Sequence, residues 1–465
     1  MARAAFLGLL LVTLFSLQVD DGVAAQQPNI VFILADDLGY GDLGCFGQKQ
    51  IATPHLDKMA ADGMKLTQHY AGSTVCAPSR CVLMTGKHSG HVPIRDNRNV
   101  SPTSNKPLPD DEVTIAELLQ EQGYATALIG KWGLGDQHNA GFPNQQGFDY
   151  TFGYLDQSHA HNYFPEFLFR NGERVTLRNF VPAARPSGAG VASEKVDYSH
   201  DRIAEEAHAW LRLNHRKPFF LYLAVTLPHA NNEAGSRGQE TPDFGQYADR
   251  DWPDSQKGTA SMITRLDETV GQVRELLELL GVEENTIVVF SSDNGPHAEG
   301  GNDPAYFHSS GPLRGIKRDL YEGGIRVPTI VAWPGQISPG HVEDTVSAFQ
   351  DWLPTFAELA GSETPSDIDG ISLVPMLTGQ GEQAQHDFLY WEFFKEGGKR
   401  AIRSGDWKGV QLGMKQSRKP IELYDLRSDL SEEHDLADEH PEVVARLERL
   451  MDSAHSDSGD YSFRD

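Results

Sequence analysis

STVCAPSRCVLMTG, residues 73–86, is the stretch from which the fold and the chemistry of this chain are best interpreted. It places Cys76 two residues before Pro78 and four before Arg80. A helix that begins at Cys76 and ends near Thr85 would direct its free N–H groups at an anion beside residue 76. A lone cysteine is more often a buried structural thiol. The flanking segments must therefore supply the partners that a reactive residue 76 requires.

Toward the N-terminus, a buried strand is predicted to end in two acidic residues. Residues 30–35 are continuously apolar, which is typical of a central strand buried on both faces. Asp36 and Asp37 follow directly. Adjacent carboxylates at the end of a buried strand repel each other and are costly to desolvate unless a cation lies between them. For an isolated pair, a solvated loop is the alternative.

Toward the C-terminus, three further predicted strands also end in polar residues. They span 125–129, 218–225 and 287–291, and they lead into Lys131, His229 and the pair Asp293–Asn294. Helices are predicted at residues 54–62, 76–85, 114–123, 201–213, 261–280 and 350–360. This alternation indicates βαβ units. Because ligands bind at the carboxyl ends of strands in such sheets, we expect these polar residues to form one site.

In this combination of motifs, the chain resembles the type I (formylglycine-dependent) sulfatases, arylsulfatase-like members of the alkaline phosphatase superfamily. Six residues fit the signature that directs oxidation of the cysteine to formylglycine: Cys76, Pro78, Ser79, Arg80, Thr85 and Gly86. Lys131 follows Gly130 as in the family's Gly-Lys-Trp motif, and Lys317 precedes EGGIRVP, residues 322–328, as in its second signature. The order of these motifs along the chain is also that of the family.

The resemblance implies a particular α/β fold and domain organisation. We expect an α/β/α sandwich around a large, mostly parallel mixed sheet in a catalytic domain at residues 26–380. A smaller C-terminal domain of antiparallel sheet plus helix is expected at residues 386–465. Its strands are predicted at residues 388–393, 400–403 and 407–411, and its helix at residues 441–451.

The resemblance also implies a role for each site residue. A calcium ion, with magnesium as the alternative, would be held by Asp36, Asp37, residue 76, Asp293 and Asn294. The family mechanism implies that the hydrated formylglycine at position 76 attacks sulfur and that sulfate is eliminated afterwards. The remaining catalytic residues would be Arg80 to orient the hydrate, Lys131 and Lys317 to bind sulfate, and His229 to protonate the leaving oxygen.

One position departs from the family pattern. Gly133 stands where the family motif Gly-Lys-Trp-His has its histidine. His138 and the cluster at residues 158–161 are the nearby candidates to replace it, and of these His161 is preferred for substrate contact. His297 and Arg314 are further candidates to line the substrate pocket.

Composition limits the classes of function. The chain has 465 residues, three cysteines and a formal net charge of −26. Such an acidic protein does not suit nucleic acid, and an anionic substrate requires a site that is locally basic. Three cysteines are too few for a disulfide scaffold, so Cys45 and Cys81 are expected to be buried free thiols.

Residues 1–25 predict a cleavable secretory signal peptide, with cleavage after Ala25 and no stable membrane insertion. The protein is therefore expected to be periplasmic or secreted. Its expected substrate is a sulfated carbohydrate or an aryl sulfate, and its expected partner is a formylglycine-generating maturation enzyme. Two alternatives remain open, namely a phosphonate or phosphodiester hydrolase of the same superfamily and a catalytically silent glycan-binding protein with an unoxidised Cys76.

Overall fold

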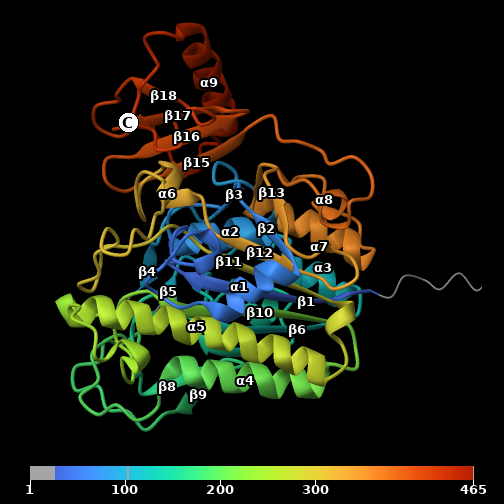
Figure 1. Cartoon of the computed structure of the whole chain (residues 1–465), viewed down its shortest axis with the longest axis vertical. Helices are drawn as coiled ribbons and strands as arrows, with labels where there is room; N and C mark the ends of the chain where they lie inside the picture. The colour runs from blue at the N-terminus through green and yellow to red at the C-terminus, as the bar shows by residue number, and fades with distance from the viewer. Residues whose placement is uncertain (1–26, 102–103, 464–465) are drawn as a thin grey trace, which may run out of the picture.

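The structure, a computed structural model, describes residues 27–101 and 104–463. The predicted signal peptide therefore lies outside the described residues. In the described part of the chain, a ten-stranded sheet has the order β13-β2-β12-β11-β1-β10-β6-β7-β8-β9. A separate four-stranded sheet, β15-β16-β17-β18, lies near the C-terminus (Figure 1).

The centre of the large sheet is parallel. β11 (Thr286–Ser292), β1 (Asn29–Asp36), β10 (Phe219–Pro228), β6 (Ala125–Lys131) and β7 (Tyr150–Tyr154) pair in parallel in that order. Every residue of β1, β10 and β11 is buried, which explains their nearly unbroken apolar sequences. Their carboxyl ends meet at one edge of the sheet, as the sequence predicted.

The outer strands make the sheet mixed. On one side, β12 (Thr329–Ala332) and β2 (Met64–Leu66) are antiparallel additions, and β13 (His341–Glu343) pairs in parallel with β2. On the other side, β8 (Phe167–Arg170) and β9 (Glu173–Thr176) are antiparallel. Within residues 140–200, β7 and the β8–β9 hairpin therefore extend the large sheet. Strands this short and partly exposed carry little periodic signal.

Two layers of helices enclose the sheet, and the alternation of side chains along β1 explains both. Val31 and Ile33 face a core with α1 (Pro54–Asp62), α4 (Ser199–Asn214) and α5 (Asp254–Leu279). Phe32 and Leu34 face a second core with α2 (Cys76–Thr85), α3 (Ile115–Glu121), α7 (Trp352–Ala360) and α8 (Val374–Thr378). The predicted α/β/α sandwich is confirmed, with α4 and α5 together on one side (Figure 1).

Local signals located several helix ends. α1 begins at Pro54 and stops before Gly63, and α2 begins at Cys76, as predicted. At α3, the Thr114 hydroxyl accepts a hydrogen bond from the Glu117 amide, and the Glu117 carboxylate accepts one from the Thr114 amide. α5 begins at Asp254, well before the predicted residue 261. Its first turns are polar or small and lack apolar periodicity.

The C-terminal sheet is antiparallel and packs against one helix. It consists of β15 (Leu389–Phe393), β16 (Lys399–Ser404), β17 (Trp407–Leu412) and β18 (Ile421–Asp425), with α9 (Pro441–Ala454) over it. The sequence missed β18. The remaining short elements are β3 (His69–Tyr70), β4 (Asn99–Ser101), β5 (Ser104–Asn105), β14 (Ser347–Ala348) and α6 (Glu322–Ile325). Among the residues described, no helix has the length and apolarity to cross a bilayer.

Candidate active site

The two acidic residues predicted at the end of β1 lie at the centre of the site. Asp36 is the last residue of β1, and Asp37 adopts a left-handed backbone with φ 67°. Aspartate tolerates this conformation better than most residues do. The turn is held because the Asp37 amide donates to Asp293 Oδ1 at 3.1 Å and the Leu38 amide donates to Ser292 Oγ at 2.9 Å. The ends of β1 and β11 are thereby tied together.

Asp293 and Asn294 complete an oxygen-rich group. Asn294 Nδ2 donates to Asp37 Oδ1 at 2.7 Å, while Asn294 Oδ1 is buried and has no hydrogen-bond partner among the described residues. An unpartnered buried carbonyl oxygen beside several carboxylates is what a hard divalent cation requires. The donor set therefore fits calcium or magnesium, and Asp36, Asp37, Asp293 and Asn294 would hold the ion.

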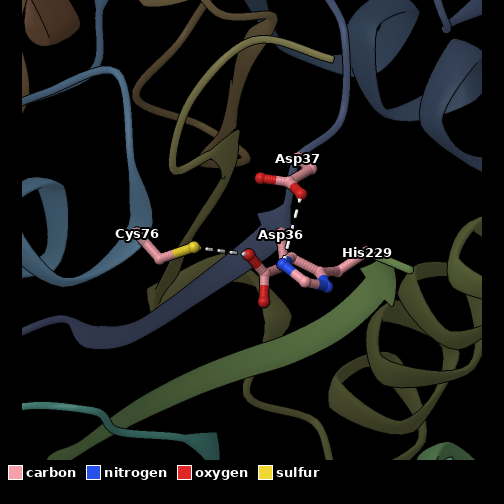
Figure 2. A group of neighbouring side chains, drawn as sticks. All are labelled: Asp36, Asp37, Cys76 and His229. Carbon is pink, nitrogen blue, oxygen red and sulfur yellow. Dashed lines mark hydrogen bonds and ion pairs between the residues drawn. The ribbon is translucent and has the colours of Figure 1, made fainter. Parts of the chain in front are cut away.

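Cys76 faces this group from the first residue of α2. Its Sγ donates to Asp36 Oδ1 at 3.3 Å, and Figure 2 shows the thiol directed at that carboxylate. The ligand atoms of Asp36, Asp37, Cys76 and His229 lie within 4.8 Å of one another. Burial, reinforced by Asp36, raises the pKa of the Cys76 thiol, so it is protonated here. An unaltered Cys76 is thus a hydrogen-bond donor and a poor nucleophile.

Arg80, one turn along α2, forms hydrogen bonds that hold the acidic group in position. Its Nε and Nη2 donate to Asp293 Oδ2 at 3.1 and 2.8 Å, and its Nη1 donates to the Lys131 carbonyl at 2.9 Å. Burial and Asp36 raise the pKa of Asp293 to about 7, whereas the contacts with Arg80 favour its ionised form. Arg80 therefore holds the ends of β6 and β11 in place, which the sequence did not predict.

Two lysines bring positive charge to the carboxylates. Lys131, the last residue of β6, places its Nζ 2.7 Å from Asp36 Oδ2. Lys317 places its Nζ 2.7 Å from Asp37 Oδ2. Burial opposes their charged forms, but the neighbouring carboxylates outweigh it and raise both lysine pKa values. Together with Arg80, they balance the charges of Asp36, Asp37 and Asp293, so a bound dication would leave the site attractive to an anion.

His229 lies just beyond β10, beside Lys317. Its Nδ1 is 2.7 Å from the Ala230 carbonyl and its Nε2 is 3.2 Å from Lys317 Nζ. Burial and the charge of Lys317 hold its pKa well below the usual value. The imidazole is therefore neutral, with Nδ1 as donor and Nε2 as acceptor. Its ring stacks with those of His161 and His297, at centroid distances of 4.9 and 5.9 Å.

A cavity of about 250 Å³ reaches Cys76, His229 and Lys317. Most of its other lining side chains are carboxamides, cations or polar groups: Asn97, Asn99, Gln157, Ser158, His161, Asn232, Arg318 and Lys395. Its apolar side chains are Val75 and Phe393. A larger cavity of about 370 Å³, between α1, α5 and residues 241–247, contains none of the predicted site residues.

Comparison with known proteins assigns this arrangement to a family. The family model described as Sulfatase matches residues 28–362. The chain belongs to the sulfatase family. It is a type I sulfatase of the alkaline phosphatase superfamily, an enzyme that hydrolyses sulfate esters. A second model, described as N-sulphoglucosamine sulphohydrolase, C-terminal, matches residues 316–457 of the sulfatase.

Three similar proteins illustrate the range of the family. Arylsulfatase A of Homo sapiens is 33% identical, with 92% of the sulfatase chain and 87% of that protein covered. N-acetylgalactosamine-6-O-sulfatase of Bacteroides thetaiotaomicron is 30% identical, with 94% of each chain covered. The crystal structure of Ps i-CgsB in complex with k-i-k-neocarrahexaose has a TM-score of 0.77 at 28% identity, with 92% of each chain covered.

The residues predicted from the sequence to contact substrate differ in whether they line the cavity of the sulfatase. His161 lines the cavity and places its Nδ1 3.2 Å from Glu233 Oε2. His297 does not line the cavity, because it is buried behind His229 with both ring nitrogens bonded to backbone atoms. Arg314 also lies elsewhere, donating to Tyr424 Oη at 3.1 Å. His138 is exposed and outside the cavity lining.

The C-terminal sheet reaches the cavity through residues that the sequence did not single out. Trp391 and Glu392 are buried, and the residues at and just after the end of β15 that line the cavity are Phe393 and Lys395. The missed residues Asn97, Asn99, Asn232 and Arg318 also lie in loops or at short strands. Polar loop residues carry no periodic signal, so only the folded chain shows which of them converge.

Glu322, the start of the second signature, joins the C-terminal sheet to the site. Its Oε1 is 2.7 Å from Lys408 Nζ, and its Oε2 accepts hydrogen bonds from Tyr70 and Arg326. Lys408 lies in β17 and is fully buried, as is Glu322. This part of the signature therefore anchors β17 beside Lys317. All three cysteines are free, as expected, but of the two predicted buried thiols Cys81 is buried and Cys45 is only partly buried.

Proposed function

We propose that this sulfatase releases sulfate from sulfated carbohydrates by means of a formylglycine formed from Cys76. The observation that carries the substrate class is the polar wall of the cavity, with Val75 and Phe393 as its apolar side chains. Carboxamides and cations suit a polyhydroxylated anion, whereas a steroid or a simple aryl group would require a mainly apolar pocket. The names of the relatives acting on or bound to sugars support the same class.

The modified residue would supply, as its hydrate, one hydroxyl to attack sulfur and a second to expel sulfate. A bound calcium or magnesium ion would supply stabilisation of negative charge beside it. The N-terminus of α2 presents backbone N–H groups to the same place. Lys131 and Lys317 bind the sulfate oxygens by exchanging their contacts with Asp36 and Asp37 for contacts with the substrate.

Proton transfer to the leaving oxygen is assigned to His229. Its Nε2 accepts a hydrogen bond from Lys317 Nζ at 3.2 Å, and His229 lines the cavity that also reaches Cys76. None of the three Arg80 hydrogen bonds described above involves Cys76. Arg80 maintains Asp293 and the end of β6 in the geometry that the other groups need.

Mass analysis of the peptide that contains residue 76 tests the proposal directly. Protein produced together with a formylglycine-generating enzyme should carry the aldehyde, and Cys76→Ala protein with unchanged thermal unfolding should release no sulfate. The matched control is Cys81→Ala, five residues along the same buried helix, which should keep its activity. Full sulfate release by protein with an unmodified thiol would refute the formylglycine proposal.

The alternatives are separated by substrate panels. Sulfated mono- and disaccharides, matched aryl sulfate and aryl phosphate esters, and phosphodiesters should be compared under the same conditions. We expect sulfated sugars to give the largest kcat/KM. A preference for phosphorus esters would favour the superfamily alternative, and sugar binding without turnover would favour a silent glycan-binding protein. We further propose that the mature protein is periplasmic or secreted, which N-terminal sequencing of exported material would test.

A further inference from the structure

The side chain of Gln157 fills the space next to Gly133, where the family motif has its histidine. Gly133 has φ 80°, and a Cβ atom built on it would lie 2.1 Å from Gln157 Nε2 and 2.7 Å from Gln157 Cδ. The two side chains therefore cannot both occupy this place. In this conformation, the Gln157 carboxamide occupies the space that a side chain at position 133 would need.

The backbone fixes this pairing. The Trp132 amide donates to the Tyr154 carbonyl at 2.9 Å, and the Gly133 amide donates to the Leu155 carbonyl at 3.1 Å. The alignment of β6 with β7 thus continues beyond both strands. The backbone amide of Gln157 donates to Asn105 Oδ1 at 2.8 Å, which positions the residue against the β4–β5 hairpin. The main-chain bonds of Tyr154 and Leu155, together with the hydrogen bond from the Gln157 backbone to the Asn105 side chain, hold Gln157 beside the Lys131 segment.

The side-chain amide nitrogen of Gln157, Nε2, has no hydrogen-bond partner among the described residues. The side chain is 6% exposed, and Nε2 is buried without a hydrogen-bond acceptor among the described residues. A buried donor left unsatisfied is costly, and its partner is usually a bound ligand, an ordered water or an ion. Gln157 also lines the cavity that reaches Cys76. The missing acceptor is therefore expected from the substrate.

We propose that Gln157 is a substrate-binding residue whose Nε2 donates a hydrogen bond to an oxygen of the sulfate group, on the side of Lys131. It takes the place of the histidine that Gly133 lacks. Unlike an imidazole, a carboxamide does not titrate, so this contact persists at any working pH. The inference rests on sulfate-ester hydrolysis and is independent of which sugar is the substrate.

The test compares Gln157→Met with Gln157→Asn and measures two quantities. Methionine has a similar length and no donor, so kcat/KM on a sulfate ester should fall about ten- to a hundredfold, the range for a hydrogen bond to a charged group. Inorganic sulfate, measured by calorimetry on the same folded proteins, should bind more weakly by a similar factor. Asparagine keeps the amide donor, but its shorter side chain places that donor farther from the sulfate. Gln157→Asn should therefore give an intermediate loss of kcat/KM and of sulfate affinity.

Stability distinguishes a substrate contact from a structural one. Because Nε2 has no protein partner, Gln157→Met should unfold at the wild-type temperature or above it. The matched control is Gln256→Met, a buried glutamine on α5 outside the cavity lining, which should leave kcat/KM unchanged. If Gln157→Met keeps both kcat/KM and sulfate affinity within twofold, the proposal is refuted. Because sulfate binding needs no turnover, that result stays distinct from a failure of the proposed carbohydrate substrate.

Discussion

Replacing Lys408 by methionine tests how strongly the C-terminal sheet is anchored. Lys408 Nζ lies 2.7 Å from Glu322 Oε1 and 3.4 Å from Glu432 Oε1, and all three side chains are fully buried. Methionine fills a similar volume but leaves two buried carboxylates without this cation. Breaking a buried ion pair in this way costs about 3–5 kcal/mol.

The neighbouring contacts place the cost within that range. Glu322 keeps its hydrogen bonds from Tyr70 at 2.6 Å and Arg326 at 3.2 Å, so its charge remains partly compensated. Glu432 keeps one hydrogen bond, from the Glu322 amide at 2.7 Å. Burial, opposed by Lys408, already raises the pKa of Glu432 to about 7, so this carboxyl will be protonated in the variant. We therefore expect a loss near the lower end, about 3 kcal/mol.

Denaturant unfolding of wild type, Lys408→Met, Glu322→Gln and the double variant would measure the coupling energy. The double variant should be markedly less destabilised than the sum of the single variants, because it no longer contains an unpaired charge at Glu322. Lys395→Met is the control, since its ammonium is exposed and makes a single hydrogen bond, to the Asn97 carbonyl. A loss below about 1 kcal/mol for Lys408→Met, the value typical of an exposed pair, would refute the reasoning.

Three further predictions concern other parts of the molecule. His386 Nε2 lies 2.8 Å from Asp351 Oδ1; burial lowers the histidine pKa, but Asp351 outweighs it and raises the pKa above 6.5. The stabilisation that the protonated His386–Asp351 pair gives to the folded state is complete below pH 6.5 and is lost as the pH rises through the folded-state pKa. In thermal unfolding, His386→Gln should therefore destabilise the protein at pH 6 and much less at pH 9. Chelation of divalent ions should lower the free energy of unfolding, by about 2.7 kcal/mol if calcium was present at a hundred times its Kd, and added calcium should reverse the change. Lys395→Ala should raise KM for a multiply sulfated sugar about three- to tenfold at low salt, without changing kcat on a small aryl sulfate; an effect that persists in high salt would argue against an electrostatic contact.

The strands and helices that surround the site were predictable because burial determines their sequences. β1, β10 and β11 are buried throughout and mainly apolar, and α2 begins where its signature places Cys76. The convergence of Asp36, Lys131, His229 and Asp293 followed from one topological rule about the ends of parallel strands.

The remainder of the site depends on loops, where spacing along the chain says little about distance in space. His297 and Arg314 were chosen for their chemistry, yet one is enclosed by backbone partners and the other stacks on Tyr321 at 3.9 Å. Gln157 carried no signal in the sequence. Its significance depends on a missing partner and on the proximity of Gly133, and neither is visible until the chain is folded.

Helix α2 is buried along its whole length, and Cys76 exposes 1% of its surface. A maturation enzyme that must bind residues 73–86 cannot reach them in the folded protein. The proposed conversion of Cys76 would therefore have to precede folding, while the segment is still an accessible chain. A molecule that folded first would keep its thiol. Under the proposed mechanism, the relative rates of modification and folding would set the fraction of active molecules once, at synthesis.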